Sequence, residues 1–427
     1  MANKNKRRLI VVPAVVATLV ATVFLLNLTL GNEPLERRLE HRYSVGDAEF
    51  VRSMGVLLGP ALVEGNRVEV LLNGDEIFPA MLAAIRSAES SINFETYIYW
   101  SGRIGREFAD ALSERARAGV EVRVLVDWVG GEKLEESFFA ELESAGVKVR
   151  RYNRPHWWNV GRLNHRTHRK LLVVDGKVGF TGGVGIADLW LGDAEDPDHW
   201  RDNHYRVTGP AAGQLQAAFA DNWLQASGEV LHGERYFPAL DAVGPHFANV
   251  FASSPDGGSD SMELMYLLAI AAASESIQLS MAYFVPDDVA LRMLVEARKR
   301  GVKVQMIMPG RITDSDIVRN ASRGRWGPLL AAGAEIYEYR PTMYHCKVMI
   351  VDGLWVSVGS TNFDSRSFSM NDEANLNVYD AEFARRQVAI FEDDVKQARR
   401  ITFAEWRQRP WHEKAKEWGA GLLGSQL

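Results

Sequence analysis

The sequence predicts an α/β protein made of two similar modules in tandem, each with a mixed sheet flanked by helices. Segments with the periodicity of strands alternate with segments that have the periodicity of helices from residue 66 onward. The same order of segments returns in the second half of the chain. A polar motif, His-x-Lys-x4-Asp-Gly, also occurs twice, at His168 and His345, which lie 177 positions apart (345 − 168). A repeat that carries the same polar residues twice predicts one composite site where the modules meet.

The first module opens with a regular series of elements. The apolar run at 68–72 predicts a strand, and residues 77–87 predict a helix because their apolar side chains recur at helical spacing. Apolar and polar residues alternate at 91–100, which predicts the next strand. A helix at 106–118 and a valine-rich strand at 120–127 follow.

Four pairs of segments define the repeat. They match in order along the chain, and each series ends at its own His-x-Lys motif. The matched segments are 87–92 with 273–277, 97–99 with 283–285, 116–122 with 297–304, and 145–149 with 332–336.

The chain length and one loop-forming stretch predict the domain limits. A chain of 427 residues is long enough for two cores of about 150 to 200 residues each. We expect a first module at 66–252 and a second at 253–410, with a turn-rich seam at 253–259 and an amphipathic tail at 411–427.

The N-terminal segment predicts a membrane anchor. Basic residues precede an apolar run at 9–26, which as a helix spans about 27 Å, close to the thickness of a hydrocarbon core. No convincing cleavage site follows the run, so a retained single-pass helix within 1–31 is favoured over a cleaved signal peptide. The positive charge places that end in the cytoplasm and the modules on the non-cytoplasmic face. Residues 32–65 are expected to be a juxtamembrane linker, whose charged part at 32–52 suits a helix or, as favoured here, a solvated spacer.

Charge and cysteine content limit the possible function classes. The net charge of −6 argues against a chain-wide basic field, so nucleic acid is not an expected partner. The single cysteine, Cys346, excludes an internal disulfide and a cysteine-rich metal site. It lies between two motif residues and is expected to be an inward-packed spacer.

The histidine and lysine of each motif are expected to act together. An apolar run follows each pair, which predicts a strand. Side chains two positions apart on a strand lie on one face, so His168 lies beside Lys170, and His345 lies beside Lys347.

The motif aspartates, Asp175 and Asp352, are candidate site residues by their place in the motif, but their spacing argues for a structural role. Each precedes a glycine between two apolar runs, a pattern typical of a hairpin turn. Seven residues of strand at about 3.3 Å each put them roughly 20 Å from the histidine. We therefore expect each aspartate to hold a neighbouring backbone segment or a basic side chain.

Two His-x-Lys pairs suit the chemistry of phosphodiesters. One neutral imidazole attacks phosphorus to give a phosphohistidine, while the other, protonated, donates its proton to the leaving oxygen. Lys170, Lys347 and Asn362 are expected to hold the nonbridging oxygens. The lysines would repel a metal cation and no carboxylate cluster accompanies the motifs, so we expect neither a metal nor another cofactor.

At these residues the chain resembles the phospholipase D superfamily, and in particular its bacterial cardiolipin synthase branch. The second motif fits the family pattern through Gly359-Ser360-Thr361-Asn362, Arg366-Ser367 and Asn371-Asp372-Glu373. The first motif departs from it, because Gly182-Gly183-Val184 is followed by Gly185 where the family has asparagine.

The resemblance covers residues 66–410 and implies further site residues. It includes Trp200-Arg201-Asp202 in the first half. Glu373 is expected to orient one of the histidines, and Ser360 and Gly183 are expected at the bound substrate together with it.

The resemblance also implies a reaction. We expect phosphatidyl transfer through a phosphohistidine, with His168 as the nucleophile and His345 as the acid and base, making cardiolipin from two phosphatidylglycerol molecules and releasing glycerol. The expected partners are phospholipids and the bacterial cell membrane, with no obligate protein partner. A hydrolytic phospholipase D, a nuclease of the superfamily and a non-enzymatic lipid-binding protein are the alternatives.

Four further features are less specific. The aromatic segment at 155–160 and the tail at 411–427, with Trp411 and Trp418, suit either lipid contact or ordinary packing. Arg166 is expected either at the rim of the site or in solvent, and Arg169 is expected to be a second, weaker phosphate contact.

Overall fold

The computed structural model describes residues 39–154, 164–255, 261–424 and 426, together with the isolated positions 15, 18 and 22. Residues Leu39–Leu427 form one compact unit. Apart from those three positions, the expected anchor at 9–26 lies outside the described residues, as does the aromatic segment 155–160. In the described part of the chain, no helix is both long and apolar enough to cross a membrane.

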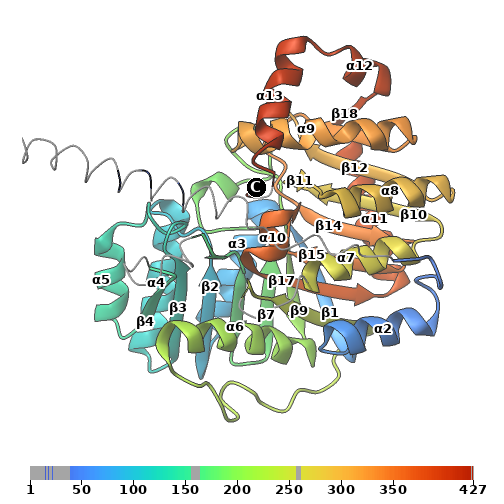
Figure 1. Ribbon diagram of the computed structural model, residues 1–427. Helices are drawn as coiled ribbons and strands as arrows, with labels where there is room; N and C mark the ends of the chain where they lie inside the picture. The colour runs from blue at the N-terminus through green and yellow to red at the C-terminus, as the bar shows by residue number, and fades with distance from the viewer. Residues whose placement is uncertain are drawn as a thin grey trace, which may run out of the picture. The chain divides into compact units, whose positions relative to one another are not determined.

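Strands and helices alternate along the first half of this unit, as the sequence predicts (Figure 1). In chain order its elements are α2 (Ala48–Leu58), β1 (Val63–Leu72), α3 (Asn73–Arg86), β2 (Ser91–Thr96), α4 (Arg103–Arg117), β3 (Glu121–Asp127), α5 (Glu136–Ser144), β4 (Lys148–Tyr152), β5 (Arg166–Thr167), β6 (Leu171–Val174), β7 (Val178–Gly182), η2 (Asp188–Trp190), β8 (Asn203–Thr208) and α6 (Ala211–Ser227).

The second half repeats this alternation and ends in two short helices. Its elements are β9 (His246–Ser253), α7 (Ser261–Ala272), β10 (Ser276–Met281), β11 (Phe284–Val285), α8 (Asp288–Lys299), β12 (Lys303–Pro309), α9 (Asp316–Ala331), β13 (Glu335–Tyr339), β14 (Lys347–Val351), β15 (Trp355–Gly359), β16 (Phe363–Asp364), α10 (Ser365–Ser369), β17 (Asn371–Tyr379), α11 (Ala381–Lys396), β18 (Ala398–Ile401), α12 (Phe403–Gln408) and α13 (Trp411–Gly421).

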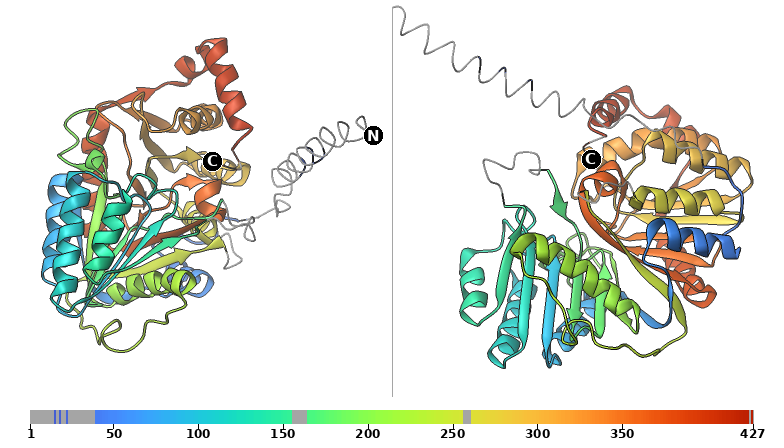
Figure 2. Two further views of the ribbon diagram at one scale, coloured as in Figure 1. Left: turned by 90° about the vertical axis from the view of Figure 1, so that its left-hand side faces the viewer. Right: turned by 60° about the horizontal axis from the view of Figure 1, so that its bottom comes forward.

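Most of the described strands form one 16-stranded mixed sheet whose two halves have the same order; β5 joins it off the main path by pairing with β17, and β11 and β16 form a separate two-stranded sheet. From the centre outward the first half runs β1, β8, β7, β6, β2, β3, β4, and the second runs β9, β17, β15, β14, β10, β12, β13, with β18 added at the edge. The directions agree as well, because β2–β3 and β10–β12 are parallel whereas β2–β6 and β10–β14 are antiparallel. The internal repeat is therefore confirmed, and Figure 2 shows the two halves side by side. The domain limits at residues 252 and 253 stay a prediction.

Helices cover both faces of the sheet and bury its strands. Leu172 and Val174 of β6 belong to the core under α3 and α4, whereas Leu171 and Val173 belong to the core under α6 and α11. The core under α6 and α11 draws its side chains from both halves and includes Cys346, the expected inward spacer. Burial of this shared apolar surface holds the halves together.

The segment expected to be a solvated linker is partly folded. Residues 48–58 form α2, which packs against α7, and Phe50, Met54 and Leu58 are buried there. The expectation of a fully solvated linker is therefore wrong, because one face of α2 is apolar at helical spacing.

Asp175 and Asp352 occupy equivalent turns, between β6 and β7 and between β14 and β15. Both have a positive φ angle, 53° and 51°. The carboxylate of Asp175 accepts hydrogen bonds from the backbone N–H groups of residues 89–91 at 2.7–2.9 Å. Asp352 does the same with residues 274–276 at 2.8–2.9 Å. These contacts agree with a structural role, since each aspartate ties its turn to the segment that enters the neighbouring strand.

Asp175→Asn should lower stability more than activity. The variant keeps one acceptor oxygen but loses the charge, so the free energy of unfolding should fall by about 1–2 kcal/mol. Burial by itself raises the pKa of Asp175, but the backbone donors outweigh it and the pKa lies below its ordinary value. The stabilisation is therefore present above the unfolded pKa of about 4 and is lost as the pH falls through the lower folded pKa.

Chemical unfolding of the wild type and Asp175→Asn at pH 7 and pH 3 measures this difference, which should shrink at pH 3. A variant with native stability and no turnover would contradict the structural role.

Candidate active site

The two motif histidines lie just before their strands rather than on them. β6 begins at Leu171 and β14 begins at Lys347, so His168 and His345 precede the hydrogen-bonded ladder. The expectation that the motif histidines lie on strands is corrected in this respect. The reason is that each histidine is bonded to the opposite half of the protein instead of to its neighbouring strand.

Backbone hydrogen bonds cross between the halves at both histidines. The N–H of His168 donates to the carbonyl of Asp372 at 2.9 Å, where β5 pairs in parallel with β17. The N–H of His345 donates to the carbonyl of Arg201 at 2.8 Å, beside a single bridge between Arg201 and Tyr344. Thr167, just before His168, thus pairs with Asp372, which precedes the buried Glu373. Tyr344, just before His345, pairs with Arg201, which precedes the buried Asp202.

Those two acids orient the imidazole rings. Both carboxylate oxygens of Glu373 lie 3.0 Å from Nδ1 of His168. An oxygen of Asp202 lies 2.7 Å from Nδ1 of His345. Because Nδ1 is engaged in each ring, Nε2 is the nitrogen that remains for a substrate. The expected orienting role of Glu373 therefore has the geometry it requires, and Asp202 has the same geometry in the other half.

The pKa values describe neutral imidazoles beside ionised carboxylates. Burial lowers the pKa of His168 to about 4, although the Glu373 charge opposes that fall. Burial and the charge of Lys347 lower the pKa of His345. Burial alone would raise the pKa of Glu373 and of Asp202, but interactions with the adjacent histidine, including its hydrogen bond, and with the lysine bring both below their ordinary values. A neutral imidazole is the form that attacks an electrophile.

Each lysine is held next to its histidine. Nζ of Lys170 donates to the carbonyl of His168 at 2.8 Å, and Nζ of Lys347 donates to that of His345 at 2.7 Å. Nζ of Lys347 also lies 3.2 Å from Nε2 of His345. Burial lowers the pKa of both lysines, that of Lys170 to about 7. Lys170 lines the cavity, whereas Lys347 is held against the ring of His345.

A cavity of about 1060 Å³ joins the two halves at this point. His168, Lys170, His345 and Asn362 all line it. The remaining wall includes carboxylates and five aromatic residues, the latter being Tyr97, Trp100, Trp190, Trp200 and Tyr283. A cavity that combines cations with apolar walls fits an amphiphilic anion.

Aromatic rings hold the histidines from the side. The ring of Tyr97 lies 5.3 Å from that of His168, centre to centre. Trp190 and Trp200 lie 5.3 Å and 5.4 Å from the ring of His345. The indole N–H of Trp190 also donates to Asp202 at 3.1 Å.

The two halves differ at two positions, where the first half has Gly183 and Gly185 and the second half has Ser360 and Asn362. Oγ of Ser360 donates to Glu373 at 2.5 Å. At the equivalent Gly183, a Cβ atom would lie 2.2 Å from a carboxylate oxygen of Asp202, so the absence of a side chain makes room for that acid. At Gly185 a Cβ atom would lie 2.9 Å from Ile98, which leaves no space for the asparagine expected there.

The other predicted site residues lie outside the cavity lining. Ser360, Glu373 and Gly183 lie behind the histidines, and Lys347 lies against His345. Of the four residues expected to contact substrate, Asn362 is the one that lines the cavity.

The role expected for Arg169 is wrong. Its guanidinium points to the opposite side of the sheet, where it donates to the carbonyls of Ala218 and Ser253 at 2.6 Å and 3.0 Å. Arg166 does line the cavity, as expected.

Sequence reasoning assigned no role to Asp202, Tyr97, Trp190 or Trp200. Asp202 was visible within Trp200-Arg201-Asp202, but the two carboxylate segments lie at different distances from their histidines, so their equivalence was hidden. Tyr97 and Tyr283 begin the similar stretches Tyr97-Ile98-Tyr99 and Tyr283-Phe284-Val285, and both line the cavity. Their shared position was a usable signal.

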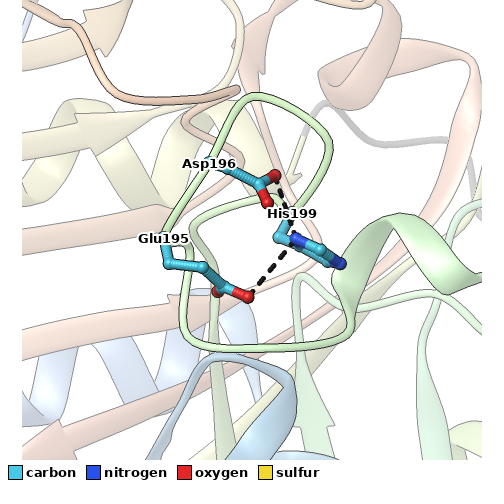
Figure 3. Close-up of side chains that lie close together, drawn as sticks. All are labelled: Glu195, Asp196 and His199. Atoms are coloured by element: carbon cyan, nitrogen blue, oxygen red, sulfur yellow. Dashed lines mark hydrogen bonds and ion pairs between the residues drawn. The ribbon is translucent and has the colours of Figure 1, made fainter.

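A separate cluster, Glu195, Asp196 and His199, lies on the loop between η2 and β8 (Figure 3). Nδ1 of His199 lies 2.9 Å from Asp196 and 3.4 Å from Glu195. These partly exposed side chains satisfy one another, and the result is that His199 is held at the cavity wall.

Two α/β repeats that bring paired histidines and lysines to one cavity define a phospholipase D-like enzyme. The sequence matches the family described as cardiolipin synthase, PLD-like domain, over residues 81–195 and 266–395. The chain belongs to this family, and it is an enzyme of the phosphatidyltransferase type.

Named relatives and one solved structure are similar over most of the chain. Cardiolipin synthase 2 of Bacillus anthracis is 36% identical over 403 residues, which covers 93% of this chain and 77% of the relative. Major cardiolipin synthase ClsA of Bacillus subtilis (strain 168) is 35% identical over 367 residues, covering 85% and 76%. Phosphatidylserine synthase of Haemophilus influenzae Rd KW20 has a TM-score of 0.71 at 13% identity and covers 89% of this chain and 100% of its own. This last likeness shows the fold alone.

Exchanging the glycine and serine of the two halves should have unequal effects. Gly183→Ser places an atom where the Asp202 carboxylate lies, so it should release His345 and lower kcat about 100-fold or more. Ser360→Gly removes one hydrogen bond to Glu373 and should lower kcat about 10-fold.

Steady-state kinetics of both variants, with thermal unfolding to confirm folding, measures the difference. Adding Gly183→Ser to Asp202→Asn should cost little further activity. Full activity of Gly183→Ser would show that Asp202 does not orient His345.

Proposed function

We propose that the protein transfers a phosphatidyl group between phospholipids and makes cardiolipin from two molecules of phosphatidylglycerol. One observation carries the proposal: two histidines line the same cavity, and each is oriented through Nδ1 by a carboxylate from the opposite half. The named relatives, which are cardiolipin synthases, support this choice of reaction among those open to the fold.

In the first step Nε2 of His168 attacks the phosphorus of the donor phosphatidylglycerol. A P–N bond forms as the P–O bond to the glycerol headgroup breaks, and His345 donates a proton to the departing oxygen. Glycerol is released and a phosphatidyl-histidine remains. The bound phosphodiester anion favours the protonated form of His345, which burial disfavours in the empty site.

In the second step His345, now neutral, accepts the proton of a primary hydroxyl on the headgroup of a second phosphatidylglycerol. The new P–O bond forms as the P–N bond breaks, which restores His168 and gives cardiolipin. The net reaction converts two phosphatidylglycerol molecules into cardiolipin and glycerol. We assign the nucleophile to His168 by analogy with the family.

Lys170, Lys347 and Asn362 have supporting roles in both steps. Lys170 and Asn362 line the cavity beside the histidines and hold the nonbridging oxygens, and Lys347, which lies against His345, adds its charge while charge moves onto the attacking and leaving atoms. Glu373, Asp202, Ser360 and Gly183 position the rings. The proposed steps need only these side chains and involve neither a metal nor a cofactor.

We further propose that the protein works at the bacterial cell membrane, where its substrates reside. The apolar run at 9–26 supplies the proposed anchor, with the catalytic unit on the non-cytoplasmic face. A hydrolytic phospholipase D is the second candidate, since water entering the same cavity takes the place of the acceptor lipid. No particular observation favours the nuclease or the non-enzymatic alternatives.

His168→Ala and His345→Ala should each lower cardiolipin formation at least about 1000-fold, because each removes a reacting group. Labelled phosphatidylglycerol in vesicles, followed by analysis of lipid products and free glycerol, measures the reaction. The wild type should produce cardiolipin and glycerol in equal amounts.

An equimolar mixture of the two alanine variants should stay inactive, because both histidines act within one chain. Phosphatidic acid without cardiolipin from the wild type would instead identify a hydrolase.

A further inference from the structure

Two arginines line the active-site cavity and have no role in the steps above. Arg166 of β5 and Arg366 of α10 both contribute to its wall. β5 is the strand that pairs with β17 in front of His168, with Arg166 opposite Asn371. Arg366 comes from the other half of the chain, so the pair assembles only where the halves meet.

The two guanidinium groups are held in the same place. Arg366 donates through Nη1 to the side-chain oxygen of Asn164 at 3.0 Å and through Nη2 to its carbonyl at 3.1 Å. Asn164 is two residues from Arg166 in sequence. Burial and the charge of Arg166 both lower the pKa of Arg366. The same two charges oppose the rise that burial causes in the pKa of Tyr97, whose ring lies against His168.

Neutral oxygens are the hydrogen-bond acceptors of this pair among the described residues. Arg166 donates to the carbonyl of His165, and Arg366 also donates to the carbonyl of Gln426 at 3.3 Å. The nearby carboxylates of Asp127 and Asp364 are committed to backbone N–H groups, those of residues 129, 130 and 167 and of residue 367. Like charges held together in a cavity create a site of positive potential.

We propose that Arg166 and Arg366 bind the phosphodiester of the acceptor phospholipid, while the histidines and lysines hold the phosphodiester of the donor. This inference rests on the proposed function, because only an acceptor that is itself a phospholipid brings a second phosphate. A guanidinium binds phosphate through paired parallel hydrogen bonds, which a lone ammonium does not offer. In the complex an oxygen of the acceptor phosphate replaces the Gln426 carbonyl at Arg366.

The subsite gives the enzyme a means of choosing a lipid over water. Water and simple alcohols have no phosphate, so they gain nothing from the arginines. A second phosphatidylglycerol gains two charge-assisted contacts that place its headgroup hydroxyl next to the phosphohistidine. The arginines are therefore specificity residues, and they should affect the choice of acceptor more than the attack on the donor.

The test is a competition between two acceptors on the full chain. Vesicles of phosphatidylglycerol with added ethanol yield cardiolipin from the lipid acceptor and phosphatidylethanol from the alcohol. Arg166→Gln and Arg366→Gln should each lower the ratio of cardiolipin to phosphatidylethanol about 10- to 100-fold, because each removes a charged hydrogen-bond donor to the acceptor phosphate. The Km for phosphatidylglycerol as acceptor should rise by a similar factor, about 10- to 100-fold.

Two control variants separate binding from structure. Asn164→Ala removes the side-chain oxygen, one of the three neutral acceptors of Arg366, and keeps both charges and the two backbone carbonyls, so the ratio should stay within about 3-fold of the wild type. Arg325→Gln removes a guanidinium that pairs with Asp288 outside the cavity, and it should also leave the ratio unchanged.

An equal loss of both products in the arginine variants, or no change in either, would overturn the subsite. A ratio that falls as much in Asn164→Ala as in Arg366→Gln would also overturn it, because the effect would then be structural. Wild-type protein that makes phosphatidylethanol but no cardiolipin would refute the proposed function itself. The products of the wild type are therefore analysed before any variant is compared.

Discussion

The site depends on contacts that cross between the two halves at each histidine. A backbone N–H and an imidazole nitrogen of one half are bonded to a carbonyl and a carboxylate of the other. Neither half alone contains a histidine with its orienting acid, so each repeat is incomplete without its partner. The shared apolar core under α6 and α11 makes this crossing possible, because it fixes the relative position of the two series of strands. The duplication is thus expressed as one site instead of two.

The same crossing sets the electrostatics and allows the halves to differ. Burial lowers the pKa of His168 and His345, while the buried acids stay ionised beside them. The first half has lost two side chains of the pattern, at Gly183 and Gly185. The space at Gly183 is occupied by Asp202, and the indole N–H of Trp190 donates to that acid. The asymmetry therefore has a steric origin, and it gives the two ends of the cavity different surroundings.

Local pattern predicted much of the fold, because alternation and helical spacing are properties of neighbouring residues. The repeat also predicted that the strand order would occur twice, and the spacing of Asp175 predicted its turn. The pairings between the two halves could not be predicted from the sequence, because the pairing of β5 with β17 joins residues about 200 positions apart. For the same reason, only the structure shows that Asp202 contacts His345 and that the Arg169 side chain points to the side of the sheet away from the cavity. The linker expectation failed because the apolar face of α2 finds a partner only in the folded second half.

The most direct test of a single shared site is the number and position of covalent phosphatidyl groups per chain. Labelled phosphatidylglycerol is mixed with the enzyme, the reaction is quenched within one turnover under alkaline denaturing conditions, and peptides are mapped by mass spectrometry. At most one phosphatidyl group per chain, carried by the peptide that contains His168, is the predicted result. Two groups per chain, on peptides containing His168 and His345, would show two independent sites and contradict the account.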